Sequence, residues 1–161
     1  MRTTLAVFAA LFLFAACGTK DDSSLFDQYF EPYQDLISGQ EVNELNKDLV
    51  GGMRSYSAKD YGNAIKQLST FSEKYPDLAS PYLYMGISQL AQGNSFKAEL
   101  QFDHIDNIVP NNFIDQSQWY SALCLLQSGQ IDRCKEDLNT IISKSSHAYH
   151  SEAEALFSEL K

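Results

Sequence analysis

The alternation of apolar and polar positions from about residue 45 onward predicts a succession of helices. Apolar residues recur at i, i+3, i+4 and i+7, the spacing that places them on one face of an α-helix. The clearest pair covers residues 82–92 and 95–108, which are separated by a Gly93-Asn94 turn. Pro76 and Pro110 mark helix ends, because proline lacks the backbone N–H that a continuing helix needs. The pattern predicts an all-α fold of short helical hairpins.

The hairpin pattern repeats along the chain. A shift of 34 residues brings Gly52 onto Gly86, and a further shift of 36 brings Gly86 onto Ala122. Small residues stand where the two helices of a hairpin must approach closely, and large residues fill the space further along. Other positions that coincide are Ala64, Ala98 and Cys134; Leu68, Phe102 and Leu138; and Phe71, Ile105 and Ile141. Such self-similarity is the signature of a repeat array.

This arrangement resembles the tetratricopeptide repeat in its period and in the placing of small, aromatic and proline residues. The resemblance implies an α-solenoid of three helix-turn-helix repeats over residues 43–148. Asp48 and Gln118 depart from the family, which prefers an aromatic residue at that position. Residues 149–161 form an amphipathic pattern with Tyr149, Leu156 and Leu160 on one side. We expect them to be a capping helix over the last open edge of the array.

The N-terminus reads as a secretion signal. Arg2 precedes an apolar run that ends at Ala16, about 18 Å long as a helix. A bilayer core needs roughly 20 residues, so this run fits a signal peptide (residues 1–16) better than a membrane span. An ordinary secretory signal and a buried core helix are the alternatives. Residues 17–24 form a polar tether.

The small residues before Cys17 resemble a bacterial lipoprotein signal, which implies lipidation of Cys17 after cleavage. The stretch from Cys17 to Asp22 is also similar to the Lys-plus-acidic export signal of Bacteroidetes lipoproteins. These resemblances imply a chain anchored to the bacterial cell envelope by acyl chains. Both the periplasmic face of the outer membrane and the cell surface remain open.

The first helix of each repeat lines the concave face in the tetratricopeptide family. Carrying those positions over gives a mostly apolar groove without lysine or arginine. The groove residues that we expect to bind a partner are Leu49, Met53, Tyr56, Leu83, Ile87, Leu90, Trp119, Leu123 and Leu126. An exposed apolar patch of this size is unusual on a soluble protein, so something should cover it.

The chain offers its own cover for the groove. The aromatic N-terminal segment, residues 25–42, carries four aromatic residues within positions 25–33. Packing of residues 25–33 into the groove or on the first repeat is one interpretation. Binding of a partner's helix or extended peptide, and self-association, are the others.

Charge and candidate chemistry narrow the function. The chain has 12 Lys+Arg against 21 Asp+Glu, a formal net charge of −9, which argues against nucleic-acid binding. His147 and His150 have a spacing that metals use, but we interpret them as a solvated face of the last helix. Cys124 and Cys134 fit as small buried thiols, and a disulfide between them remains open. The chain shows none of the nucleotide-binding, hydrolase or metalloprotease motifs sought, so we expect no enzyme, metal or cofactor.

The function expected from these features is that of an envelope-anchored scaffold or adaptor that binds another protein through the concave groove. The alternative is a carrier of a small apolar ligand or lipid. Replacing Trp119 with alanine is expected to weaken partner capture while leaving the helices intact.

Overall fold

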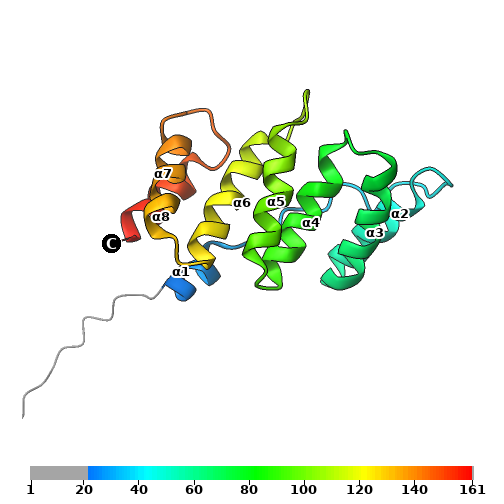
Figure 1. Cartoon of the computed structure of the whole chain (residues 1–161), viewed down its shortest axis with the longest axis horizontal. Helices are drawn as coiled ribbons and strands as arrows, with labels where there is room; N and C mark the ends of the chain where they lie inside the picture. Colours follow the sequence, from blue (N-terminus) through cyan, green and yellow to red (C-terminus); the bar gives the residue numbers. More distant parts are fainter. Residues whose placement is uncertain (1–21, 161) are drawn as a thin grey trace, which may run out of the picture.

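The computed structural model describes residues 22–160. The predicted signal peptide, Cys17 and residues 17–21 of the predicted tether lie outside this range. Within residues 22–160 the chain forms eight helices and no strand, which confirms the all-α prediction (Figure 1). The helices are α1 (Asp22–Tyr29), α2 (Lys47–Ser57), α3 (Tyr61–Lys74), α4 (Ala79–Ala91), α5 (Ser95–Asp106), α6 (Ile114–Gln127), α7 (Ile131–Ile142) and α8 (His150–Glu159).

Consecutive helices from α2 to α8 pack side by side in an array. Three hairpins, α2/α3, α4/α5 and α6/α7, succeed one another, and α8 follows against α7 with Ala153 and Leu156 buried. α1 begins inside the predicted tether, at Asp22, and packs against α6 and α8. Among the described helices, none is both long enough and apolar enough to cross a bilayer.

The three hairpins share one turn geometry. The turns pass through Lys59, Gly93 and Gly129, each with a positive φ (58°, 78° and 72°). In each turn the following backbone N–H bonds back over five residues; Asn94, for example, donates to the Gln89 carbonyl at 2.9 Å. Glycine adopts this left-handed conformation without strain, whereas Lys59 adopts it despite its side chain. The recurrence of the turn supports the repeat inferred from the sequence.

The core of each hairpin sets a small residue against a large one. A Cβ added to Gly86 would lie 2.5 Å from Phe102, and one added to Gly52 would lie 2.8 Å from Leu68. Phe102 and Leu68 have no exposed surface. Any side chain at either glycine would therefore force Phe102 or Leu68 out of its present position. The spacing read from the sequence reflects a real steric requirement in the first two hairpins.

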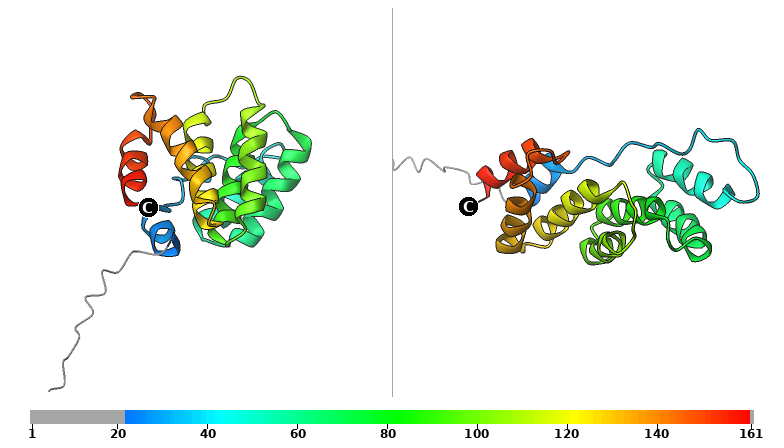
Figure 2. Two further views of the ribbon diagram at one scale, coloured as in Figure 1. Left: turned by 60° about the vertical axis from the view of Figure 1, so that its left-hand side comes forward. Right: turned by 90° about the horizontal axis from the view of Figure 1, so that it is seen from above.

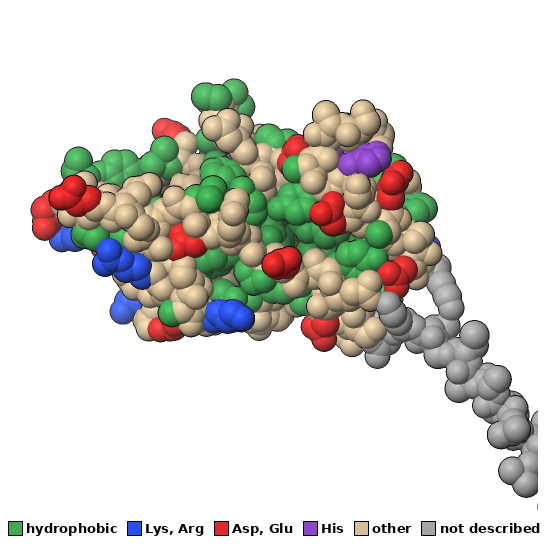
Figure 3. All heavy atoms as spheres, turned by 180° about the vertical axis from the view of Figure 1, so that it is seen from behind, with side chains coloured by type: hydrophobic (Ala, Val, Ile, Leu, Met, Phe, Trp, Pro, Cys, Tyr) green, Lys and Arg blue, Asp and Glu red, His purple; other side chains and the backbone are tan. Residues whose placement is uncertain are grey.

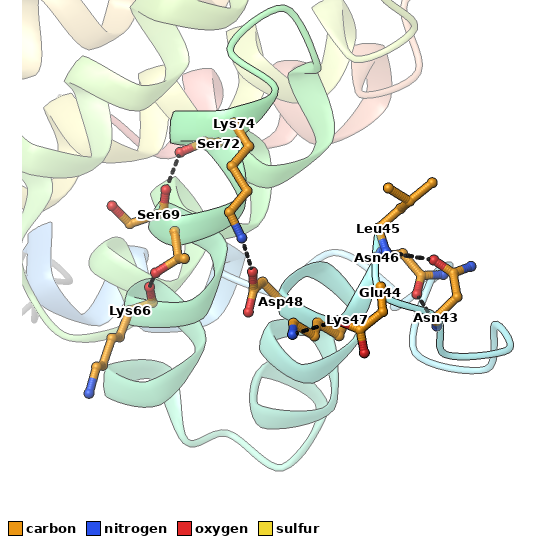
Figure 4. A network of polar contacts seen from close by, with 11 residues as sticks. Asn43, Glu44, Leu45, Asn46, Lys47, Asp48, Lys66, Ser69, Ser72 and Lys74 are labelled. Atoms are coloured by element: carbon orange, nitrogen blue, oxygen red, sulfur yellow. Dashed lines mark hydrogen bonds and ion pairs between the residues drawn. The ribbon is translucent and has the colours of Figure 1, made fainter.

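Polar pairs occupy the site where the resembling family prefers an aromatic residue. Lys74 of α3 donates to Asp48 of α2 at 2.6 Å, near the turn that leads into α2 (Figure 4). Lys144 donates to Gln118 at 3.3 Å in the same register, two hairpins later. Such surface pairs contribute at most about 1 kcal/mol each to the free energy of folding. Burial of the apolar core is therefore the larger source of stability in these hairpins.

The array has an inner face formed by α2, α4 and α6. α2 contacts α4, and α4 contacts α6, whereas the second helices of neighbouring hairpins do not approach each other as closely. The first helices therefore lie on the inside of the curve. Residues 30–37, which we call the strap, run along this face after α1 (Figure 2, right). The chain then turns back through residues 38–46 to begin α2.

Candidate functional site

Three tyrosine hydroxyls bind the strap to the inner face. Tyr120 of α6 donates to the Glu31 carbonyl at 2.6 Å. Tyr56 of α2 donates to the Tyr33 carbonyl at 2.7 Å, and Tyr84 of α4 donates to the Gln34 carbonyl at 2.9 Å. Each first helix of the three hairpins supplies one of these donors. These three hydrogen bonds hold the backbone of the strap, not its side chains.

Aromatic side chains complete the contact between the N-terminal segment and the array. Leu25 and Phe26 of α1 are buried in the same core as the repeats. Phe30 stacks on Phe26, with ring centroids 5.0 Å apart, and meets the edge of Tyr120 at 6.4 Å. The Tyr33 ring lies 6.3 Å from that of Tyr84. Of the interpretations for residues 25–33, the structure shows packing over the groove.

Asp35 anchors the far end of the strap. Its carboxylate accepts the backbone N–H groups of Ile37 (2.8 Å) and Ser38 (2.9 Å), and the Ser57 hydroxyl at the end of α2. Burial opposes the charged form, but the hydrogen bonds outweigh it and lower the pKa of Asp35. The strap is thus held at both ends, by α1 on α6 and by Asp35 on α2.

The nine side chains that the sequence analysis assigns to a partner-binding groove are buried in the structure. All nine lie on α2, α4 and α6, and each is at most 9% exposed: Leu49, Met53, Tyr56, Leu83, Ile87, Leu90, Trp119, Leu123 and Leu126. All nine belong to the common core of the array, so a partner cannot reach these side chains in this conformation. The proposed test at Trp119 needs correction, because this residue is 3% exposed and stacks on Tyr149. Truncating a buried tryptophan would destabilise the fold by about 3–5 kcal/mol.

Burial also fixes the protonation state of the three tyrosines that donate to the strap. It raises the pKa of Tyr56, Tyr84 and Tyr120 well above the ordinary phenol value. These hydroxyls therefore keep their protons and remain donors throughout the physiological pH range.

Replacing Tyr84 with phenylalanine should lower the free energy of unfolding by about 1 kcal/mol, since the Gln34 carbonyl loses its donor. Chemical denaturation measures the change. Tyr82→Phe on the same helix is the control, because the Tyr82 ring packs beside His104 and its hydroxyl makes no hydrogen bond among the described residues. Equal stability of the two variants would contradict the assignment of Tyr84 as a strap-binding residue.

A cleft of about 270 Å³ remains open on the inner face, between the strap, α6 and α8. Trp119 and Tyr120 of α6 line it, with Tyr149 at the start of α8. Sequence reasoning placed Trp119 in the groove but missed the cleft itself. Its other walls come from residues far apart in the chain: Tyr29, Glu31, Pro32, Tyr33, Gln34 and Glu152. The density of aromatic residues at positions 25–33 was the only available signal.

The histidine pair differs from its interpretation as a solvated helix face. His147 lies in the turn before α8, with a fully buried side chain whose Nδ1 accepts the Tyr149 backbone N–H at 3.1 Å. Burial lowers the pKa of His147, although Asp115 partly opposes the shift. His150 pairs with Glu154 at 3.5 Å. Within the described part of the chain, no three His, Cys, Asp or Glu side chains gather as metal ligands.

The two cysteines of the third hairpin are both buried and are not bonded to each other, so the disulfide left open by the sequence is not formed. Burial raises the pKa of the Cys124 thiol. These side chains act as small core residues between α6 and α7.

Comparisons with family models, curated proteins and solved structures found no match to this chain. The likeness to the tetratricopeptide repeat therefore rests on the residues and the helical geometry described above.

Proposed function

We propose that this protein is a tetratricopeptide-type adaptor lipoprotein of the bacterial cell envelope, which binds an extended segment of another protein on its inner face. Anchoring would occur through acyl chains on Cys17, as the signal-like residues 1–17 imply. In this proposal the strap occupies the partner's site until the partner replaces it. No catalytic role is proposed.

One observation carries this proposal. Tyrosines from three successive hairpins donate to the backbone carbonyls of Glu31, Tyr33 and Gln34. Backbone carbonyls are present in every peptide, so the same donors suit an extended segment of a different sequence.

Strap docking and partner binding are then linked. The apparent affinity of a partner that needs the uncovered face equals its intrinsic affinity multiplied by the fraction of molecules in which that face is free. Weakening the strap by about 1.4 kcal/mol should raise the apparent affinity about tenfold. Phe30 is the residue to change, because its ring contacts Phe26 and Tyr120 and it belongs to the strap, not to α2, α4 or α6.

The experiment is chemical cross-linking in the native cell followed by mass spectrometry, with wild type, Phe30→Ala and Leu36→Ala compared. Leu36 is 54% exposed on the strap and serves as the matched control. We expect one protein to be cross-linked, with several-fold more adduct in Phe30→Ala and no change in Leu36→Ala. Equal or smaller adduct in Phe30→Ala would exclude the inner face as the docking site.

A further inference from the structure

A buried histidine lies in the turn that leads into α8. The His147 side chain has no exposed surface, and its Nδ1 atom accepts the backbone N–H of Tyr149, the residue that caps α8, at 3.1 Å. A ring nitrogen that accepts a hydrogen bond carries no proton, so the neutral ring holds its proton on Nε2. His147 thus supplies a partner for a backbone N–H at the start of α8, where a helix leaves such groups unpaired.

Asp115 of α6 joins this turn to the array. Its Oδ2 atom accepts the backbone N–H of Ala148 at 2.8 Å. Its Oδ1 atom lies 3.6 Å from Nε2 of His147, which is too far for a hydrogen bond. Nε2 therefore has no hydrogen-bond partner among the described residues. The two ring nitrogens differ in their roles, because Nδ1 holds the start of α8 and Nε2 only faces a carboxylate.

Proton uptake by this ring would remove the acceptor that holds the start of α8. A protonated imidazole donates from both nitrogens, so Nδ1 would then point a proton at the Tyr149 N–H. The added positive charge would also lie near the N-terminus of α8, where the helix dipole disfavours it. Asp115 favours the charged ring, whereas Lys144, in the turn after α7, and His150 of α8 oppose it.

The charged form of His147 is disfavoured mainly by burial. Burial has the largest effect on the pKa of His147 and lowers it. Figure 3 shows that acidic side chains predominate on the surface at the end of the array that carries α7 and α8, whereas most visible lysines and arginines lie towards the opposite end. Burial, more than repulsion by basic neighbours, therefore opposes the charge, and the ring takes up a proton more easily once it reaches water.

The position of α8 matters for two parts of the fold. α8 packs against α7, with Ala153 and Leu156 buried. Glu159, at the end of α8, accepts the hydroxyl of Tyr29 of α1 at 2.7 Å. Release of α8 would therefore uncover apolar surface at the end of the array and remove a contact that holds α1.

We propose that His147 is an acid-sensitive switch, which keeps α8 docked on the array while its ring is neutral and releases α8 when the ring is protonated. In the released turn the ring is in water, where the pKa of histidine is about 6.5. Because the docked state has the lower pKa, docking is fully stable above this pH and weakens as the pH falls below it. The equilibrium shifts towards release by about tenfold for each pH unit between the two pKa values and levels off below the lower one.

Amide hydrogen exchange of the full chain, measured by NMR above and below the ordinary pKa of histidine, tests this switch. Protection factors, which correct for the effect of pH on the intrinsic exchange rate, should fall several-fold for the amides of α8 in acid. The amides of α4 are the internal reference and should keep their protection. Fluorescence of Trp119, the single tryptophan of the chain, should change over the same pH range, because its ring stacks on Tyr149 with centroids 5.3 Å apart.

Three variants isolate the contribution of His147. His147→Asn is the matched control, because the side-chain oxygen of asparagine accepts a backbone N–H two residues further on but does not titrate. It should keep α8 protected in acid. His150→Gln should behave as the wild type, since His150 pairs with Glu154 and makes no contact that holds the turn. Asp115→Asn should move the loss of protection to lower pH, because the charged ring loses the carboxylate that favours it.

Three results would overturn the proposal. One is an equal loss of α8 protection in the wild type and in His147→Asn, and another is full protection of α8 in the acidified wild type. The third is a pKa of the His147 ring, from an NMR titration of the wild type, at or above the ordinary histidine value. This last measurement does not depend on the folding of any variant. None of the readouts needs a protein partner, so the test is independent of the adaptor function.

Discussion

Replacing Phe102 with alanine should lower the free energy of unfolding by about 3–5 kcal/mol. Phe102 has no exposed surface, fills the space left by Gly86, and stacks on Tyr120 with ring centroids 5.9 Å apart. Its loss therefore opens a cavity between the second and third hairpins. Urea denaturation followed by circular dichroism measures the effect.

The control for this variant is Phe96→Ala on the same helix. Phe96 is 71% exposed, so its removal should change stability by no more than about 0.5 kcal/mol. Similar losses for both variants would mean that α5 does not present the face described here to the core.

Replacing Leu25 with alanine should lower the free energy of unfolding by about 2–5 kcal/mol, the range for a fully buried leucine. Leu25 is 2% exposed on α1, which packs against α6 and α8. The size of the effect matters because α1 precedes the repeats and belongs to none of them. A large loss would show that the N-terminal segment is part of the folded core.

Leu36→Ala provides the comparison, since Leu36 belongs to the same N-terminal segment but is 54% exposed. It should change stability by less than about 0.5 kcal/mol. A cost below 1 kcal/mol for Leu25→Ala would instead indicate that α1 is only loosely attached.

The repeat array was predictable because its steric requirements repeat. A small residue must face a large one in every hairpin, as Gly86 faces Phe102. Equivalent pairs therefore coincide when the sequence is aligned with itself at a shift of one repeat. The turns give a second repeated signal, a glycine with positive φ at Gly93 and Gly129. The first turn has Lys59 at the equivalent position, so the sequence does not show this signal there. Local geometry of this kind leaves periodic traces in the sequence.

The strap and the cleft leave no such trace. Tyr120 and Glu31 are 89 positions apart, and the bond between them uses a carbonyl that every residue possesses. Likewise, Tyr29 and Glu159 meet only because α1 packs against α6 and α8, at the C-terminal end of the array. The sequence could indicate that the apolar face needs a cover, but not which atoms would hold that cover.

The most direct test of the account is to measure through-space contacts between the strap and the inner face. NMR cross-relaxation between ring protons should connect Phe30 with Tyr120 and Tyr33 with Tyr84, whose ring centroids lie 6.4 Å and 6.3 Å apart. Phe102 with Tyr120, at 5.9 Å within the array, serves as the internal reference. Cross-peaks for all three pairs are predicted; a reference peak without the two strap peaks would contradict the claim that residues 30–37 cover the inner face.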